Sequence, residues 1–363
     1  MAILTVNAGS SSLKLSVIGD HDRLEAEHEL DAPGAEIDRS ELDAILGEEQ
    51  DGIAAVVHRI VHGGEQFTSA VRIDDAVTEA IEQLTDLAPL QQPKSLAALR
   101  AVSERLPDTP GIACFDTAFH QTLSPAAFTY ALPARWRRRW SVRRFGFHGL
   151  SHGWVARRVP ELCAVKPAAV RIVSCHLGAG ASLCAIAGGR SVDTTMGFTP
   201  LEGLVMATRS GTVDPGLLLW LIEHEEVDAG ELGDALEHRS GLAGIAGTGD
   251  MREILERASD DEDAQLAIDV YIHRLRGQIA AMAAALGGLD VIAFTGGVGE
   301  RSAEVRERTA ADLGFLGVCL DSDRNRAAST DAEIGADGAT VRTVVVHARE
   351  DLEMVRLARP LLA

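Results

Sequence analysis

The chain has few of the features that mark secreted, membrane-spanning or nucleic-acid-binding proteins. Its five cysteines form no C-x-x-C pair, so we expect small buried side chains in a reducing compartment. No run of about 18 apolar residues and no N-terminal segment of the signal-peptide type occurs. A net charge of −20 argues against nucleic acid or an anionic membrane as the main partner. We therefore expect a soluble cytoplasmic protein, and its 363 residues suffice for two domains.

Lysine and asparagine are also scarce, which draws attention to the N-terminal segment. The chain has three lysines and two asparagines, and Asn7 and Lys14 stand together in VNAGSSSLKLSV, residues 6–17. Alternating apolar residues on both sides of the Ser-rich turn predict a β-hairpin. One explanation for the proximity of Asn7 and Lys14 is coincidence in a chain of biased composition. A polar site at the tip of the hairpin is the other.

Alternating strand and helix patterns predict an α/β protein. Strand patterns cover 3–6, 13–18 and 53–57, and helical patterns follow over about 75–87 and 95–105. A single apolar stripe from Ile268 to Leu286 predicts a long helix. Strands that alternate with helices indicate sheets covered by helices.

A second strand–turn–strand segment, residues 170–187, resembles the first. His176, Gly178 and Ser182 stand where the opening segment has Asn7, Gly9 and Ser12. This similarity predicts an internal duplication in which the two turns face each other across a cleft. The alternative is that two unrelated hairpins look alike.

Three turns rich in Gly or Ser follow strand patterns, at 7–12, 178–182 and 296–299. Glycine lets backbone N–H groups approach a phosphate closely, and hydroxyls add further donors. One such turn is weak support, but three together favour a nucleotide-phosphate site. No G-x-x-x-x-G-K-[ST] segment is present, so the site is not of the P-loop type.

Charged residues beside tight turns are the candidates for anion and metal binding. Arg59 in HRIVHGGE and Arg209 in TRSGTVDP can each present a planar fork to a carboxylate or phosphate. Asp116 follows a strand pattern in FDTAFH, and Glu350 follows another, where a carboxylate could hold Mg²⁺.

Two other motifs allow functional interpretations that do not involve phosphate binding. His58 and His62, like His148 and His152, are spaced four apart, which would suit zinc on a helix, although their contexts are not helical. Two alternatives to zinc binding remain. An imidazole could donate a hydrogen bond to a phosphate, or the histidines could be buried structural residues, as for His58, His62 and His152. RWRRRW, residues 135–140, has the composition of a nucleic-acid patch, but the acidic net charge favours a solvated or inter-subunit surface.

Ten segments together resemble one family. They occur in the order expected of acetate kinases, and the resemblance covers roughly residues 3–356. The segments are VNAGSSSLKLSV, HRIVHGGE, LAPL, FDTAFH, RRFGFHGLSH, HLGAGAS, DTTMGFTPLEGL, TRSGTVDP, SGLAGIAGTGDMR and FTGGVGE.

The resemblance implies a fold and an activity. The fold would be two duplicated ribonuclease-H-like domains of the actin, sugar kinase and heat-shock chaperone superfamily, flanking a nucleotide cleft. The N-terminal domain would comprise 1–120 with 352–363, and the C-terminal domain 121–351 with the adenosine site. The activity would be reversible phosphoryl transfer from ATP to acetate, giving acetyl phosphate and ADP. Mg²⁺, or Mn²⁺ in its place, would be the cofactor, and the protein would be a homodimer.

The resemblance also assigns roles to individual residues. Asn7 and Glu350 would bear on the metal, and the catalytic residues would be Arg59, Asp116, His148 and Arg209. A small apolar pocket for the acyl methyl group would be formed by Val61, Leu90, Phe147 and Pro200. Nucleotide binding would involve Asn7, Ser10, Ser12, Lys14, His176, Gly178, Gly180, Asp250, Met251, Arg252, Gly296, Gly297 and Gly299.

The expected chemistry needs no general base. A carboxylate with a pKa near 4–5 is already ionised at neutral pH. The reaction instead needs alignment and neutralisation of negative charge.

Several positions depart from the pattern usual in the family. Gln91 replaces a His, Ala179 and Arg301 replace Asn, Thr212 replaces Asp, and RED near the end replaces NEE. Two alternatives stay open, of which only the second follows from these departures. One is a propionate kinase, because one methylene is worth only about 1–3 kcal/mol of discrimination. The other is a nucleotide-binding regulator of this fold without catalysis.

Overall fold

The same sheet is built twice along the chain. The computed structural model describes residues 2–9, 12–31, 38–49, 52–89, 91–225 and 227–362. The chain divides into two units, which are described separately. Unit 1 comprises Met1–Gln121, Phe147–Trp154 and Arg349–Ala363, and unit 2 comprises Thr122–Gly146 and Val155–Ala348.

Within the described residues, unit 1 contains a six-stranded sheet of order β3-β2-β1-β4-β6-β5. Its strands are β1 (Ala2–Ala8), β2 (Ser12–Ile18), β3 (Leu24–Asp31), β4 (Ile53–Ile60), β5 (Val71–Arg72) and β6 (Gly111–Phe115). Its helices are α1 (Arg39–Glu49), α2 (Asp75–Glu82), α3 (Gln92–Arg105), the first part of α6 (Gly149–Leu162) and α15 (Glu350–Leu362).

Unit 2 repeats this arrangement, with a described sheet of order β11-β12-β10-β7-β8-β9. Its strands are β7 (Arg171–Leu177), β8 (Ala181–Ala187), β9 (Arg190–Thr194), β10 (Val291–Thr295), β11 (Ala332–Glu333) and β12 (Arg342–Val345). Its helices, besides the rest of α6, are α4 (Pro125–Phe128), α5 (Ala134–Trp140), α7 (Pro215–His224), α8 (Ala229–His238), α9 (Gly241–Ala246), α10 (Met251–Arg257), α11 (Glu262–Ala285), α12 (Gly296–Arg301), α13 (Ala303–Ala311) and α14 (Ser322–Ala327).

The pairing of the strands confirms the predicted duplication. In unit 1 an antiparallel β3-β2-β1 meander is followed by the parallel strands β4 and β6 and the antiparallel β5. In unit 2 β9-β8-β7, then β10 and β12, then β11 pair in the same senses. Each unit therefore has the fold of the ribonuclease-H-like domain, and the hairpins β1-β2 and β7-β8 are equivalent.

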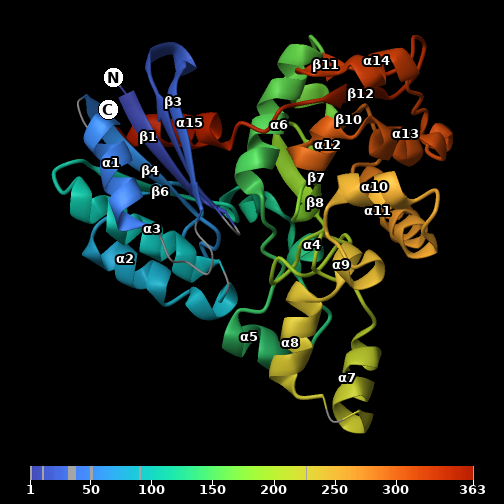
Figure 1. Cartoon of the computed structure of the whole chain (residues 1–363), viewed down its shortest axis with the longest axis horizontal. Helices are drawn as coiled ribbons and strands as arrows, with labels where there is room; N and C mark the ends of the chain where they lie inside the picture. Colours follow the sequence, from blue (N-terminus) through green and yellow to red (C-terminus); the bar gives the residue numbers. More distant parts are fainter. Residues whose placement is uncertain are drawn as a thin grey trace. The chain divides into compact units, whose positions relative to one another are not determined.

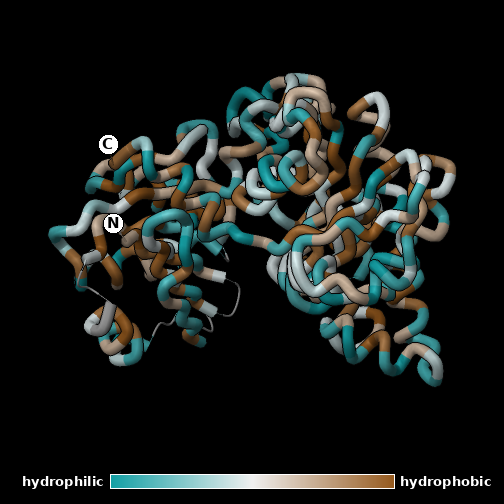
Figure 2. Tube along the Cα trace, turned by 90° about the horizontal axis from the view of Figure 1, so that it is seen from above, coloured by the Kyte–Doolittle hydropathy of each residue, from teal (hydrophilic) through white to brown (hydrophobic). Residues whose placement is uncertain are grey.

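Alternation along the strands divides the core of unit 1 between the two faces of its sheet. Leu4 and Val6 pack with α1 and α3, whereas Ile3 packs with α15. Helix α15 therefore lies against strands that precede it by more than 300 residues (Figure 1). Hydrophobic stretches of the chain, brown in Figure 2, run through the interior of each unit, where the buried apolar residues lie.

The long helix α11 confirms the predicted apolar stripe. Ile268, Ile272, Leu275, Ile279 and Met282 are all buried, and Asp261 caps the first turn by accepting from two backbone N–H groups. None of the helices in the described part of the chain is long and apolar enough to cross a membrane.

Two local predictions are wrong in detail. The Gly-rich segment 296–299 is predicted as a turn between a strand and a helix, but it forms the start of α12, although glycine is a poor helix former. Glu300 Oε1 accepts the Gly296 N–H at 2.9 Å, which stabilises that first turn. The helix predicted over 75–87 ends at Glu82, and a separate 3₁₀ turn covers Thr85–Leu87.

Candidate active site

Unit 1 gathers polar side chains at the carboxyl ends of three adjacent parallel strands. Asn7 lies near the end of β1, Arg59 near the end of β4, and Asp116 directly after β6. Because β4 pairs with both other strands, these ends meet at one edge of the sheet. Glu350, the first residue of α15, joins the group: Asn7 Nδ2 donates to Glu350 Oε2 at 2.8 Å.

Arg59 connects the members of this cluster. Its Nη2 donates to Asp116 Oδ2 at 2.6 Å and its Nε to Oδ1 at 3.1 Å, a bidentate ion pair. Its Nη1 donates to Asn7 Oδ1 at 2.9 Å and lies 3.9 Å from Glu350 Oε2. The structure thus brings together four residues that the sequence analysis selected separately.

Burial sets the electrostatics of the cluster. The Asp116 side chain is 1% exposed, and those of Arg59 and Glu350 are each 13% exposed. Burial alone would lower the pKa of Arg59, but the carboxylates of Asp116 and Glu350 raise it, so the guanidinium stays charged. Burial raises the pKa of Asp116, and Arg59 opposes this effect. One guanidinium faces two carboxyl groups.

His148 is fixed by its backbone beside this cluster. Its φ is +55°, a left-handed conformation that is uncommon for a residue with a side chain. The His148 N–H donates to the Asp116 carboxylate, and the His148 carbonyl accepts from His152 N–H at 3.0 Å. The strained backbone is therefore held on both sides of the residue.

Glycine is required at position 149 because the start of α6 lies close to the backbone of Asp116. Its N–H donates to the Asp116 carbonyl oxygen at 3.0 Å, and a Cβ at this position would lie 2.0 Å from that oxygen. Only glycine lets the start of α6 approach the end of β6 this closely.

The predicted acyl-pocket residues of unit 1 are partly within the described structure. Val61 and Phe147 are buried, and Phe147 meets the His62 ring edge-on at 5.4 Å between centroids. Leu90, and Ser10 of the first turn, lie outside the described residues.

The zinc alternative receives no support. His58 is buried in β4, and His62 Nδ1 accepts from the Gly64 N–H at 2.9 Å. Among the described residues, no group of three or more His, Cys, Asp or Glu side chains is placed to hold a metal ion.

Ser12 and Lys14, predicted to support the first phosphate turn, bind the neighbouring strand β3. Ser12 Oγ donates to Glu29 Oε1 at 2.7 Å, and Lys14 Nζ pairs with Glu27 at 2.8 Å. Lys14 is directly opposite Asn7 in the β1-β2 ladder, so the two scarce residue types are cross-strand neighbours.

In unit 2, Arg209 lies in the loop 205–214 between β9 and α7. Its Nη1 donates to the Pro200 carbonyl oxygen at 2.9 Å, and its Nε lies 3.6 Å from Glu237. Burial lowers the pKa of Arg209, and Glu237 opposes that shift. The structure thus joins two further predicted residues, Arg209 and Pro200.

A cavity of about 680 Å³ in unit 2 brings together the predicted nucleotide residues. Gly178 and Ala179 of the β7-β8 turn line it, as do Asp250, Met251, Arg252 and Gly297. Its volume is within the usual range for small-molecule sites, about 300–1,000 Å³. Gly296 and Gly299 are buried in the same helix as Gly297.

The cavity walls are fixed by local hydrogen bonds. In the β7-β8 turn, the Gly178 N–H donates to the Gly180 carbonyl, and the Ala179 carbonyl accepts from Ala207 N–H, both at 3.0 Å. Asp250 caps α10 and pairs with Arg252 at 2.9 Å, which lowers the pKa of Asp250. His176 lies in β7, paired with Ser182 of β8.

Several residues that line this cavity were not predicted from the sequence. They include Ala207, Leu242, Leu255, Tyr271, Val298 and Ser302. Tyr271 belongs to the apolar stripe of α11 and is one of only two tyrosines in the chain. This scarcity was the one feature of the sequence that could have indicated Tyr271. In unit 1, Gln92 was also not predicted as a functional residue. Its amide donates to the His62 and Ile81 carbonyls and accepts from the His62 N–H.

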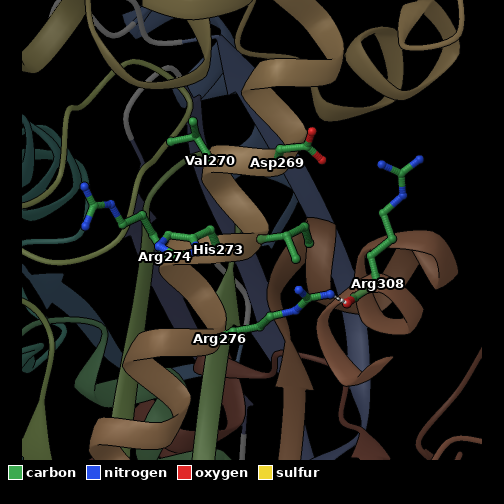
Figure 3. Close-up of a pocket in the computed structure, with 7 residues that line it drawn as sticks. Asp269, Val270, His273, Arg274, Arg276 and Arg308 are labelled. Atoms are coloured by element: carbon green, nitrogen blue, oxygen red, sulfur yellow. Dashed lines mark hydrogen bonds between the residues drawn. The ribbon is translucent and has the colours of Figure 1, made fainter. Parts of the chain in front are cut away.

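A second cavity in unit 2, of about 690 Å³, contains none of the predicted residues. It lies beside α11 and α13 and is lined by charged side chains that include Asp269, Arg274 and Arg276 (Figure 3). Arg276 pairs with Asp312, and Arg308 with Glu304 at 2.6 Å. Two of the three arginines that line this cavity are thus paired with carboxylates.

Comparison with known proteins identifies the family. The model of the acetokinase family matches residues 36–356. The chain belongs to the acetokinase family. It is 39% identical to the acetate kinase of Acetivibrio thermocellus, over 98% of each chain.

Solved structures of the family have the same fold. The acetate kinase of Porphyromonas gingivalis is similar with a TM-score of 0.90 and 33% identity, over 100% of both chains. A propionate kinase from Francisella tularensis is similar with a TM-score of 0.90 and 31% identity, over 98% of both chains.

Several departures from the acetokinase pattern occupy defined positions. Ala179 and Arg301 both line the cavity of unit 2. Thr212 Oγ1 accepts from the Gly203 N–H at 3.1 Å, and its own N–H donates to the Gly203 carbonyl. The hydroxyl therefore links the loop of Arg209 to the preceding segment.

Proposed function

We propose that the protein catalyses reversible transfer of the γ-phosphoryl group of ATP to acetate, giving acetyl phosphate and ADP. The observation that carries the proposal is the cavity of about 680 Å³ lined by the Gly178–Ala179 turn and residues 250–252. A glycine turn that leads from a strand suits phosphates, and the cavity beside it suits a nucleoside. Acetate kinases among the relatives of this chain support the choice of acceptor.

The charged groups would act by alignment and neutralisation. Acetate is ionised at neutral pH and needs no base, and Asp116 is already engaged by Arg59 in a bidentate pair. Arg59, Arg209 and His148 would supply positive charge or hydrogen bonds to the carboxylate and the transferring phosphoryl group. Asp116 would hold Arg59 and the backbone of His148 in place.

The cluster in unit 1 fits a Mg²⁺ ion, which we include in the proposal. Asp116, Glu350 and Asn7 offer oxygen atoms, the ligand type that Mg²⁺ prefers, and Mg²⁺ sites commonly use one or two carboxylates together with substrate phosphates. Two carboxylates against one guanidinium leave a negative charge for a cation to complement. Asn7 and Glu350 would hold the ion. When bound, it would neutralise phosphate charge.

The acid would be small. Val61, Phe147 and Pro200, with Leu90, would contact its alkyl end. Propionate is the second candidate, because a propionate kinase is among the similar solved structures. The difference of one methylene is worth only about 1–3 kcal/mol.

We also propose a cytoplasmic homodimer formed through α7. Leu217, Leu219, Trp220 and Ile222 on this helix are 43–61% exposed, and none of its ten residues is buried. An apolar helix of this kind normally packs against another surface. Arginines of α5, in the segment RWRRRW, could pair with the acidic residues around α8 of a second copy.

Trapping of acyl phosphate with hydroxylamine tests the function. The protein is incubated with ATP, Mg²⁺ and acetate, propionate or butyrate in parallel. The proposal predicts hydroxamate with acetate and less with each longer acid. Hydroxamate with none of the three acids would contradict it, and more with propionate than acetate would favour the second candidate.

A further inference from the structure

Residues 196–204, which we call the Pro200 segment, connect β9 to the loop that carries Arg209. The segment has no helix or strand of its own. The Pro200 carbonyl nevertheless accepts one hydrogen bond of the Arg209 guanidinium. The position of Arg209 therefore depends on what holds this segment.

Three charged or polar side chains hold it. Arg144 Nη2 donates to Glu202 Oε1 at 2.6 Å, and Tyr130 Oη donates to Glu202 Oε2. The Tyr130 oxygen also accepts from the Phe198 N–H at 2.9 Å. Both oxygens of the Glu202 carboxylate are therefore engaged.

Arg144 fixes the start of the segment as well. Its Nη1 donates to the carbonyl oxygens of Thr194, Thr195 and Met196 at 2.9–3.1 Å. Its guanidinium carbon lies 5.6 Å from the centre of the Tyr130 ring, a cation–π contact, so Arg144 and Tyr130 contact each other as well as Glu202. With Glu202 on one side of Pro200 and residues 194–198 on the other, the segment is held at both ends.

The backbone is shaped to admit this group. A Cβ on Gly197 would lie 1.8 Å from Glu202 Oε2 and 2.2 Å from Tyr130 Oη. Only a glycine therefore allows the carboxylate and the phenol to meet against the chain at this point.

We infer that Tyr130, Arg144 and Glu202 are positioning residues that set Arg209 and the Pro200 wall of the acyl site. The inference rests on the proposed function, because it assigns the selectivity of that reaction to residues outside the cluster of unit 1. None of these three side chains lines the cavity of about 680 Å³ that is proposed to bind the nucleotide. Their loss should therefore change the handling of the acid and leave that of ATP unchanged.

Steady-state kinetics of Glu202→Gln and Tyr130→Phe test this. We expect KM for acetate to rise about tenfold and the preference for acetate over propionate to fall, because small displacements of positioning groups are costly. KM for ATP should change less than about twofold. The matched control is Glu333→Gln, which removes a similar Arg–Glu pair, with Arg342, at comparable exposure. Unchanged acid parameters in both variants of the network would overturn the inference.

Hydrogen exchange of peptides from 194–209 gives a second measurement that does not need turnover. We expect faster exchange there in Glu202→Gln than in the wild type, and no change in Glu333→Gln. Unchanged exchange in Glu202→Gln would overturn the inference even if the wild type made no acyl phosphate. The wild-type protein, assayed alongside, tests the proposed function separately.

Discussion

Replacement of Gly149 by alanine is predicted to damage the protein although alanine is the better helix former. The new Cβ would lie 2.0 Å from the Asp116 carbonyl oxygen and 2.8 Å from Phe119 Cβ. A normal C···O contact is about 3.3 Å, so the two backbones must separate by roughly 1.3 Å. Overpacking of this kind costs about 1–3 kcal/mol of stability. The backbone of His148 and the Asp116–Arg59 pair would move with it, and a shift near 1 Å can cost about 100-fold in rate.

The assay is urea denaturation together with kcat for acetyl phosphate formation. We expect Gly149→Ala to lower both, with kcat reduced about 10- to 100-fold. Gly153→Ala in the same helix is the control, because its Cβ would meet a Glu353 side-chain oxygen at 3.1 Å rather than backbone. A Gly149→Ala protein with wild-type stability and kcat would refute the role given to this contact.

Three further predictions concern different parts of the molecule. Arg209→Ala should lower kcat by about 100-fold or more while ATP still binds, whereas a kcat equal to that of the wild type would contradict the role given to Arg209. Met251→Ala, in the nucleotide cavity, should weaken ATP binding about tenfold in calorimetry without changing KM for acetate. Burial lowers the pKa of His58 to about 3, so the unfolded chain binds a proton near pH 6.5 that the folded one does not. Stability should fall by about 2 kcal/mol between pH 7 and 5 from this group, and His58→Leu should remove that loss in urea titrations; an unchanged slope would contradict it.

The duplication and the strand-end residues could be predicted because they depend on short segments. Each hairpin carries its own apolar alternation and turn residues, and parallel strands bring their carboxyl ends to one edge of a sheet. Asn7, Arg59 and Asp116 could therefore be selected without knowledge of the tertiary structure: Asn7 from a Ser-rich turn, Arg59 from its place beside a glycine pair, and Asp116 from the end of a strand pattern.

The networks between distant segments could not be predicted. Gln92 reaches the His62 backbone across 30 residues, and Tyr130 reaches Glu202 across 72. Local propensity carries no information on such partners, because tertiary packing decides which side chains meet. The incorrect prediction of a turn at 296–299 has a local cause instead. The Glu300 side chain accepts from the Gly296 N–H, four residues away, and stabilises a glycine-rich helical turn although glycine is a poor helix former.

Transfer of label from [γ-³²P]ATP tests the central claim most directly. The purified protein is incubated with labelled ATP and Mg²⁺, with and without acetate, and the products are separated before and after hydroxylamine treatment. We predict an acetate-dependent labelled product that hydroxylamine converts to inorganic phosphate, and formation of ATP when acetyl phosphate and ADP are supplied instead. Label that remains in ATP, or that appears as inorganic phosphate regardless of acetate, would contradict the account.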